Sequence, residues 1–199
     1  ESDGTFKIGQ TIDVQVVFSE AVTVNTSGGT PFITLVTNTN TNATTNVSYT
    51  SGSGTTTLVF QYTVASGDVS TDLNYDATTS LSANSGTIQD ANGNTATLTL
   101  PGTSASGSLG VNKAYVIDGI VPTVSNVTGS QANGTFIVGN TIDVQVVFSE
   151  AVTVNTSGGT PFITLETNTD TNATTNVSYT SGSGTTTLVF QYTVASGDV

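Results

Sequence analysis

The sequence predicts an all-β protein made of tandem antiparallel β-sandwiches. Two observations lead to this fold class. Apolar and polar residues alternate over several short segments, and no long segment shows helical periodicity. In addition, most of the first half of the chain returns almost unchanged in the second half, so the chain holds two copies of one module.

Strand signals occur in seven short segments of the first copy. In the clearest segment, the alternating apolar residues are Ile12, Val14, Val16 and Phe18. A period of two places one set of side chains in the core and the other at the surface. Clusters of Gly, Asn and Ser separate the predicted strands, which cover 11–18, 31–38, 45–51, 58–64, 72–77, 96–100 and 113–118. Short strands with regular turn signals predict a sandwich of immunoglobulin type.

The repeat has the length of a whole domain. Thr5–Val14 returns as Thr135–Val144, an offset of 130 residues, and residues 5–69 and 135–199 differ at only five positions. This period is too long for a solenoid repeat of roughly 20–50 residues. We therefore expect two domains: an immunoglobulin-like repeat at 1–120 that lacks its first strand, and a second at 121–199 that is incomplete at its C-terminal end.

The repeat frame is open at both ends. The first copy has no counterpart of residues 121–130, and the second has no counterpart of Ser70–Ile120. Either the native chain continues or a neighbouring subunit supplies the missing strands. Because the two copies are nearly identical, we expect a longer array and a chain that continues.

The differences between the two copies predict which side chains face the core and which face solvent. Val36 becomes Glu in the second copy, so this position should be exposed, and Ile33 and Leu35 should point inward. Lys7 becomes Ile, which indicates an exposed position that tolerates charge. Ile8 becomes Val, a conservative change that suits burial.

The charge balance excludes several function classes. Lys and Arg number 2 and Asp and Glu number 14 in 199 residues, for a net charge of −12. Such a chain lacks the cations that displace counterions from phosphate, so we expect no nucleic-acid binding. No stretch approaches the roughly 20 apolar residues of a membrane span, so we expect no membrane insertion in this segment.

Catalysis finds little support in the residue types. Cys and His are absent, which excludes disulfides, thiolate metal sites and Ser–His or Cys–His nucleophiles. Asp72 and Asp76 are close in sequence, but their spacing on a strand favours a solvent-facing pair. The chain also has no Trp to form the sugar platform that a glycosidase normally carries. We expect no enzymatic activity.

Four segments together resemble a known kind of module. They are Gly9–Val14, Phe18–Val22, Asp90–Asn94, and Val116–Asp118 leading into Val121–Val124. These segments are similar to the bacterial immunoglobulin-like repeats of very large surface proteins and adhesins. The resemblance implies an extracellular, cell-surface location and a role as spacer or adhesive stalk. It also implies stiffening by calcium at domain junctions, much as in cadherins.

Acidic and amide residues cluster in two loops of the first copy. Glu20 follows an inner strand and is expected in a loop near the N-terminal end of the domain. Asp90, Asn92 and Asn94 form an Asp-x-Asn-x-Asn loop, which in a Greek-key sandwich can fall at the same end. Calcium takes six to eight oxygen ligands from carboxylates, amides and carbonyls, so these four residues are candidate ligands. The alternative is that they are ordinary turn residues, because Asp and Asn bond their own backbone in turns.

A further pair of candidate ligands lies around the predicted linker. Asp118 ends the last strand of the first copy, and Glu150 is the second copy's counterpart of Glu20. We expect both to share an interdomain calcium site, whose third component, the counterpart of Asp90, would lie beyond Val199.

Three functions follow from these features. The first is a structural repeat of an extracellular stalk, filament or adhesin, rigidified by calcium and partnered by neighbouring repeats or subunits of the same protein. The second is an adhesive module that recognises a glycan or a cell surface. The third is a filament subunit that polymerises by strand complementation between chains.

Overall fold

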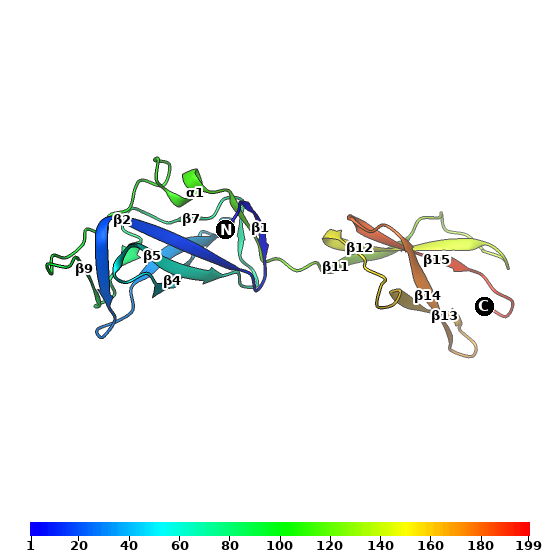
Figure 1. Cartoon of the computed structure of the whole chain (residues 1–199). Helices are drawn as coiled ribbons and strands as arrows, with labels where there is room; N and C mark the ends of the chain where they lie inside the picture. Colours follow the sequence, from blue (N-terminus) through cyan, green and yellow to red (C-terminus); the bar gives the residue numbers. More distant parts are fainter. The chain divides into compact units, whose positions relative to one another are not determined.

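A computed structural model describes residues 1–199 and confirms the all-β fold. The chain divides into two compact units, Glu1–Ile120 (unit 1) and Val121–Val199 (unit 2), shown in Figure 1. The single helix, α1 (Leu109–Asn112), has four residues. No helix of this chain is both long enough and apolar enough to cross a membrane.

Unit 1 contains ten strands that form one continuous hydrogen-bonded path. They are β1 (Gly4–Lys7), β2 (Thr11–Asn25), β3 (Phe32–Asn38), β4 (Ala43–Ser51), β5 (Thr55–Thr63), β6 (Val69–Ser70), β7 (Asn74–Tyr75), β8 (Leu81–Ser82), β9 (Thr87–Gln89) and β10 (Tyr115–Asp118). The order along the path is β1-β10-β6-β3-β4-β5-β2-β9, and β7 and β8 also pair with β3.

The path folds into two layers because β4 belongs to both. Its first part, Ala43–Ser48, pairs with β3, whereas Tyr49 and Ser51 pair with β5. Apolar side chains of the two layers meet between them. The fully buried members of this core with 1 % exposure or less are Ile12, Ile33, Leu35, Leu58, Phe60, Val64, Leu73, Ile88 and Ile117. Ile33 and Leu35 therefore point inward, as the repeat comparison predicts.

Unit 2 contains five strands in the order β11-β12-β15-β14-β13. They are β11 (Val124–Gly129), β12 (Thr141–Val152), β13 (Phe162–Asn168), β14 (Ala173–Ser181) and β15 (Thr185–Thr193). The pairing of β12 with β15 has the register of β2 with β5, residue for residue, at the repeat offset. Unit 2 has no counterpart of β6–β10, and its buried core is limited to Val146, Val177, Leu188 and Phe190.

The prediction of a strand at 96–100 is wrong. Ala96 N–H donates to Ile88 O (2.9 Å) and Leu100 N–H donates to Thr78 O (2.8 Å), so the segment bonds to different neighbours and forms no ladder. Leu100 is nevertheless buried, and Leu98 is half-buried against the core. The alternation in this segment reflects the burial of one face rather than strand pairing.

Two predictions of burial also need correction. Ile8 is 43 % exposed rather than buried, because it lies in the turn between β1 and β2, beyond the edge of the core. Val36 is half-buried rather than exposed, because Asn74 of β7 pairs with it. Lys7 is exposed as predicted.

Candidate functional site

Glu20 lies within β2 and not in a loop after it, which corrects the prediction; the same is true of Glu150 within β12. The ladder between β2 and β5 is interrupted from Val17 to Val22. Beyond the interruption, β2 continues and pairs with β9 through Thr23–Asn25. The strand therefore passes through a bulge where it changes partner, and Glu20 is exposed at this bulge.

Asp90 organises the tight turn that follows β9. The backbone N–H groups of Asn92 and Asn94 donate to Asp90 Oδ1 (2.8 Å each), and Asn94 Nδ2 donates to Asp90 Oδ2 (2.7 Å). These hydrogen bonds, led by that of the Asn94 side chain, lower the pKa of Asp90, because they favour its charged form. Asp90 therefore closes the turn, and the same hydrogen bonds stabilise its ionised form.

Glu20 and the Asp90 turn line one cavity. Its volume is ≈ 360 Å³, and Asn94 also lines it, whereas Asn92 does not. Two carboxylates and an amide are oxygen donors of the kind that a hard cation such as calcium prefers. Each carboxylate oxygen has two lone pairs, so Asp90 Oδ2 keeps acceptor capacity beyond the bond from Asn94. The side chains of Glu20, Asp90 and Asn94 are therefore oxygen donors of the type that binds calcium.

Glu150 lies where the chain enters unit 2. Thr123 N–H donates to Ser149 Oγ (3.0 Å), and Ser149 N–H donates to Thr123 O (2.8 Å). Ser149, the residue before Glu150, therefore binds the first residues of unit 2 to β12. Glu150 Oε1 is buried and has no hydrogen-bond partner. Buried polar atoms are nearly always paired in folded proteins, so this oxygen is an unsatisfied acceptor.

Asp118 lies at the opposite end of unit 1 from Glu20. It is the last residue of β10, where it pairs with Lys7 of β1 and Val69 of β6. β2 runs away from this end, so Glu20 is roughly 30 Å along the strand from it. Figure 1 shows β1 and β9 at the two ends of unit 1. The six candidate residues therefore do not form one cluster: Glu20, Asp90 and Asn94 come together, whereas Asp118 stands apart.

Asp68 organises the end of unit 1 near Asp118, a structural role that the sequence analysis missed. Its Oδ2 accepts hydrogen bonds from Tyr62 Oη (2.6 Å) and Ala65 N–H (2.8 Å). Its backbone oxygen accepts a bond from Gly119 N–H (2.7 Å), so Asp68 holds the chain directly after Asp118. Burial, together with the hydrogen bond and the charge of Asp68, raises the pKa of Tyr62 far above its ordinary value. The occurrence of Tyr62 and Asp68 in both copies is a signal that could have identified this pair.

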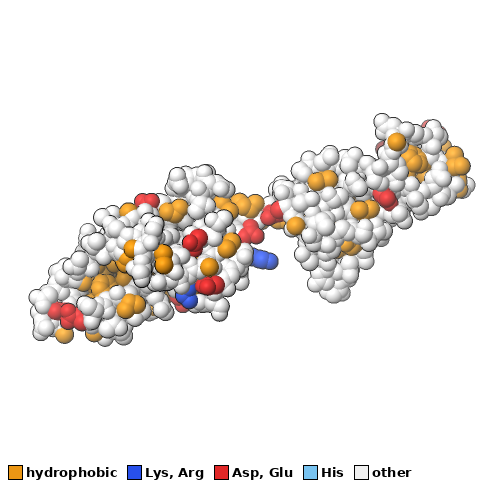
Figure 2. All heavy atoms as spheres, turned by 90° about the horizontal axis from the view of Figure 1, so that it is seen from above, with side chains coloured by type: hydrophobic (Ala, Val, Ile, Leu, Met, Phe, Trp, Pro, Cys, Tyr) orange, Lys and Arg blue, Asp and Glu red, His pale blue; other side chains and the backbone are white.

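The remaining surface is mainly uncharged. Figure 2 shows small, scattered groups of acidic side chains on a face made mostly of polar, uncharged side chains and backbone. No group of three or more acidic, His or Cys side chains lies close enough together to hold a metal ion. Asp118 and Glu150 belong to different units, so their shared site stays a prediction.

Comparisons with protein-family models, with curated proteins and with solved structures find no match to this chain.

Proposed function

We propose that this protein is a structural repeat module of an extracellular stalk, filament or adhesin, and that calcium bound at the ends of its repeats stiffens the array. The observation that carries this proposal is the placement of carboxylates in unit 1. Glu20 and Asp90 line a cavity at one end, and Asp118 lies at the other, where the chain leaves. A repeat built in this way carries oxygen ligands at both of its ends.

The position of Glu150 supports the same arrangement. It directly follows Ser149, whose side chain accepts a hydrogen bond from Thr123 N–H where the chain enters unit 2. Its buried, unpaired Oε1 is the kind of acceptor that a bound cation would satisfy. Calcium at such a site would neutralise carboxylates that otherwise repel one another and would restrict their movement.

A structural role also suits the rest of the molecule. The two copies are nearly identical, whereas a ligand-specific domain needs a surface that differs from the plain repeats. The neighbouring partners that this role requires are further repeats or subunits of the same protein. The surface is polar and carries few charged side chains, but nearly all of these are acidic. The resulting net charge of −12 favours solubility and makes neighbouring modules repel one another.

Calcium titration by calorimetry tests the proposal. We expect the chain to bind calcium and the Glu150→Gln variant to bind it several-fold more weakly. Asp76→Asn is the matched control, because it also removes one charge but lies on an exposed site away from the cavity and from residues 118 and 150. The absence of calcium binding would overturn the calcium part of the proposal, as would an equal loss of affinity in both variants.

A further inference from the structure

Strands β1 and β10 of unit 1 lie side by side and run in the same direction. Gly4 of β1 is opposite Tyr115 of β10, and Lys7 is opposite Asp118. Gly4 N–H also donates to Ala114 O (3.2 Å), which extends the contact by one residue. Because the strands are parallel, the start of β1 and the end of β10 lie at opposite ends of the pair. The chain therefore enters and leaves this pair at opposite ends.

The parallel direction decides how a pull on the chain loads the two strands. A pull at the start of β1 and at the end of β10 acts along the strands, so the hydrogen bonds between them carry the load together. In an antiparallel pair the same two points would lie at one end, and the bonds would open one after another. Forced unfolding follows the barrier to unfolding, which is higher when several bonds must break at once. The β1–β10 pair is thus arranged to resist tension.

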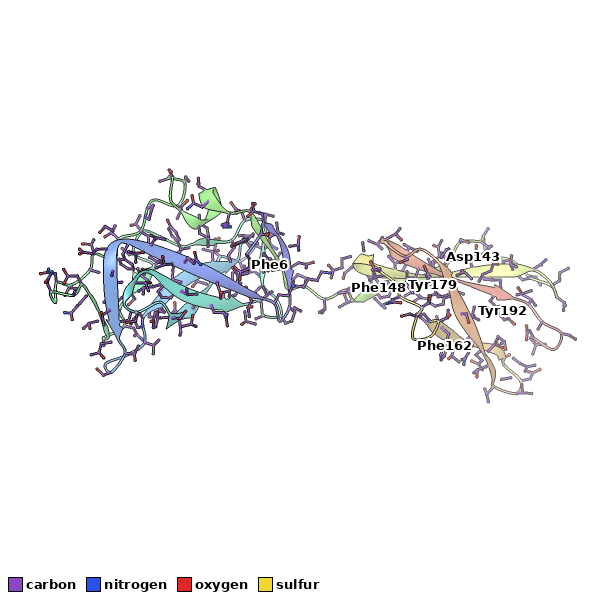
Figure 3. All side chains as sticks on the ribbon, in the orientation of Figure 1. Phe6, Asp143, Phe148, Phe162, Tyr179 and Tyr192 are labelled. Carbon is purple, nitrogen blue, oxygen red and sulfur yellow. The ribbon has the colours of Figure 1, made fainter.

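Side-chain packing opposes the sliding of β1 along β10. The rings of Phe6 and Tyr115 meet edge to face, with their centroids 5.3 Å apart. Tyr115 and Ile117 of β10 are buried, and Phe6 packs against the same core. Figure 3 labels Phe6 on β1. Sliding would therefore disturb the core as well as the backbone hydrogen bonds.

The far edge and the end of β10 are also held. β6 pairs antiparallel with β10 on the edge away from β1. Directly after β10, Gly119 N–H donates to Asp68 O (2.7 Å), and Gly67 N–H donates to Gly119 O (2.8 Å). A Cβ atom at position 119 would lie 2.3 Å from Ala65 O, so only glycine allows this close approach of backbones. A pull on the residues after Gly119 therefore reaches β10 through a fixed point.

We propose that the β1–β10 pair is a tension-bearing clamp, which keeps unit 1 folded when the chain is pulled on both sides of it. This function rests on the proposed structural role, because repeats that follow one another in a stalk transmit force from one to the next. It needs no calcium, because backbone hydrogen bonds and apolar packing form the clamp. Unit 1 would therefore carry load as well as space its neighbours apart.

Single-molecule force spectroscopy of the full chain tests the clamp. The chain has no cysteine, so two introduced thiols define where it is pulled. Ser2→Cys with Val121→Cys loads the pair lengthwise, whereas Ile8→Cys with Val121→Cys loads it from the end at which both strands stop. All three positions are exposed, and unit 2 carries no load in either geometry. We expect a several-fold higher unfolding force for the lengthwise pull, because the fold is the same and only the direction of load differs.

Two phenylalanine variants locate the resistance. Phe6→Ala should lower the lengthwise unfolding force by about half and leave the force from the other geometry unchanged. Phe18→Ala is the matched control, because Phe18 is also half-buried against the core but lies outside the pair. It should lower the melting temperature without lowering the lengthwise force.

Equal forces in the two pulling geometries would overturn the clamp, as would equal losses of lengthwise force in Phe6→Ala and Phe18→Ala. Both pulls are repeated in calcium and in EDTA. We expect the same contrast between the geometries in both, and a contrast found only in calcium would overturn the clamp, because a bound metal would then supply the resistance. Calorimetry tests calcium binding separately, so failure of the clamp and failure of the calcium proposal remain distinguishable.

Discussion

Units 1 and 2 contain the same strand sequence in two different surroundings. The hairpins are equal in both: β2–β5 and β12–β15 share their register, and so do β3–β4 and β13–β14. Even an aromatic pair is reproduced, with ring centroids 6.1 Å apart for Tyr49 and Phe60 and 6.2 Å apart for Tyr179 and Phe190. Strand pairing in this module is therefore set by local sequence.

Burial is not equal in the two units. Leu35 has no exposure, whereas its counterpart Leu165 is only partly buried. Phe162 of β13 is 58 % exposed, and Figure 3 labels it. The cause lies outside the shared sequence: in unit 1, β3 also pairs with β6, β7 and β8, whereas in unit 2, β13 pairs with β14 alone. Residues 70–120 complete the core, and the hairpins alone do not.

The largest effect is expected from supplying unit 2 with these residues. A chain with a copy of residues 70–120 appended after Val199 should bury Phe162, Ile163 and Leu165 as unit 1 buries their counterparts. Each such burial contributes about 1.5–3 kcal/mol, so the free energy of unfolding of unit 2 should rise by several kcal/mol. Denaturant unfolding followed by hydrogen exchange measures the stability of each unit separately. Peptides that contain Val36 or Glu166 can be told apart, because the two copies differ at this position.

The control for the appended segment carries Asp in place of the copy of Leu73, a residue with no exposure in unit 1. It should abolish most of the gain, because a carboxylate cannot be buried there without a partner. A gain that survives this change would mean that the appended residues act without completing the core.

A smaller effect is expected from shortening equivalent leucines. Leu35→Ala should lower the free energy of unfolding of unit 1 by about 2–5 kcal/mol, because it leaves a cavity in a closed core. Leu165→Ala should cost about 1 kcal/mol, because a partly exposed side chain loses less burial. Urea unfolding of both variants checks the difference, and equal losses would contradict the account of the two cores.

An effect smaller than that of Leu35→Ala is expected from the hydrogen bond between Tyr62 and Asp68 near the end of unit 1. Tyr62→Phe should cost about 1.5–3 kcal/mol, because it removes a hydrogen bond to a carboxylate. The raised pKa of Tyr62 means that the folded state favours the neutral phenol. Its stabilising contribution is therefore complete below about pH 10 and is lost as pH rises further towards the folded pKa. Unfolding measured at neutral and alkaline pH should show a weaker decline for Tyr62→Phe than for the parent.

Much of the fold could be predicted from the alternation of residues. The strands expected at 11–18, 31–38, 45–51 and 58–64 correspond to β2–β5. Segment 96–100 shows the limit of this approach, because its alternation arises from burial without pairing. The extension of β2 to Asn25 could not be predicted, because its second half pairs with β9, far away in the sequence.

The candidate site could be predicted only in part. The carboxylate and amide types identified Glu20, Asp90 and Asn94, which the topology brings to one cavity. Asn92 has the same residue type but does not line the cavity, since the direction of a side chain in a turn depends on backbone geometry. Asp68 was missed because its role depends on the contact of its loop with Gly119. The pairing of Asp118 with Glu150 stays a prediction.

Small-angle X-ray scattering with parallel melting curves tests the central claim most directly, namely that calcium at the repeat ends stiffens a structural array. The chain is measured in calcium and again after removal of calcium with EDTA. We predict a more extended and less flexible particle in calcium, with a higher melting temperature. Superimposable scattering curves and equal melting temperatures in the two conditions would contradict the claim.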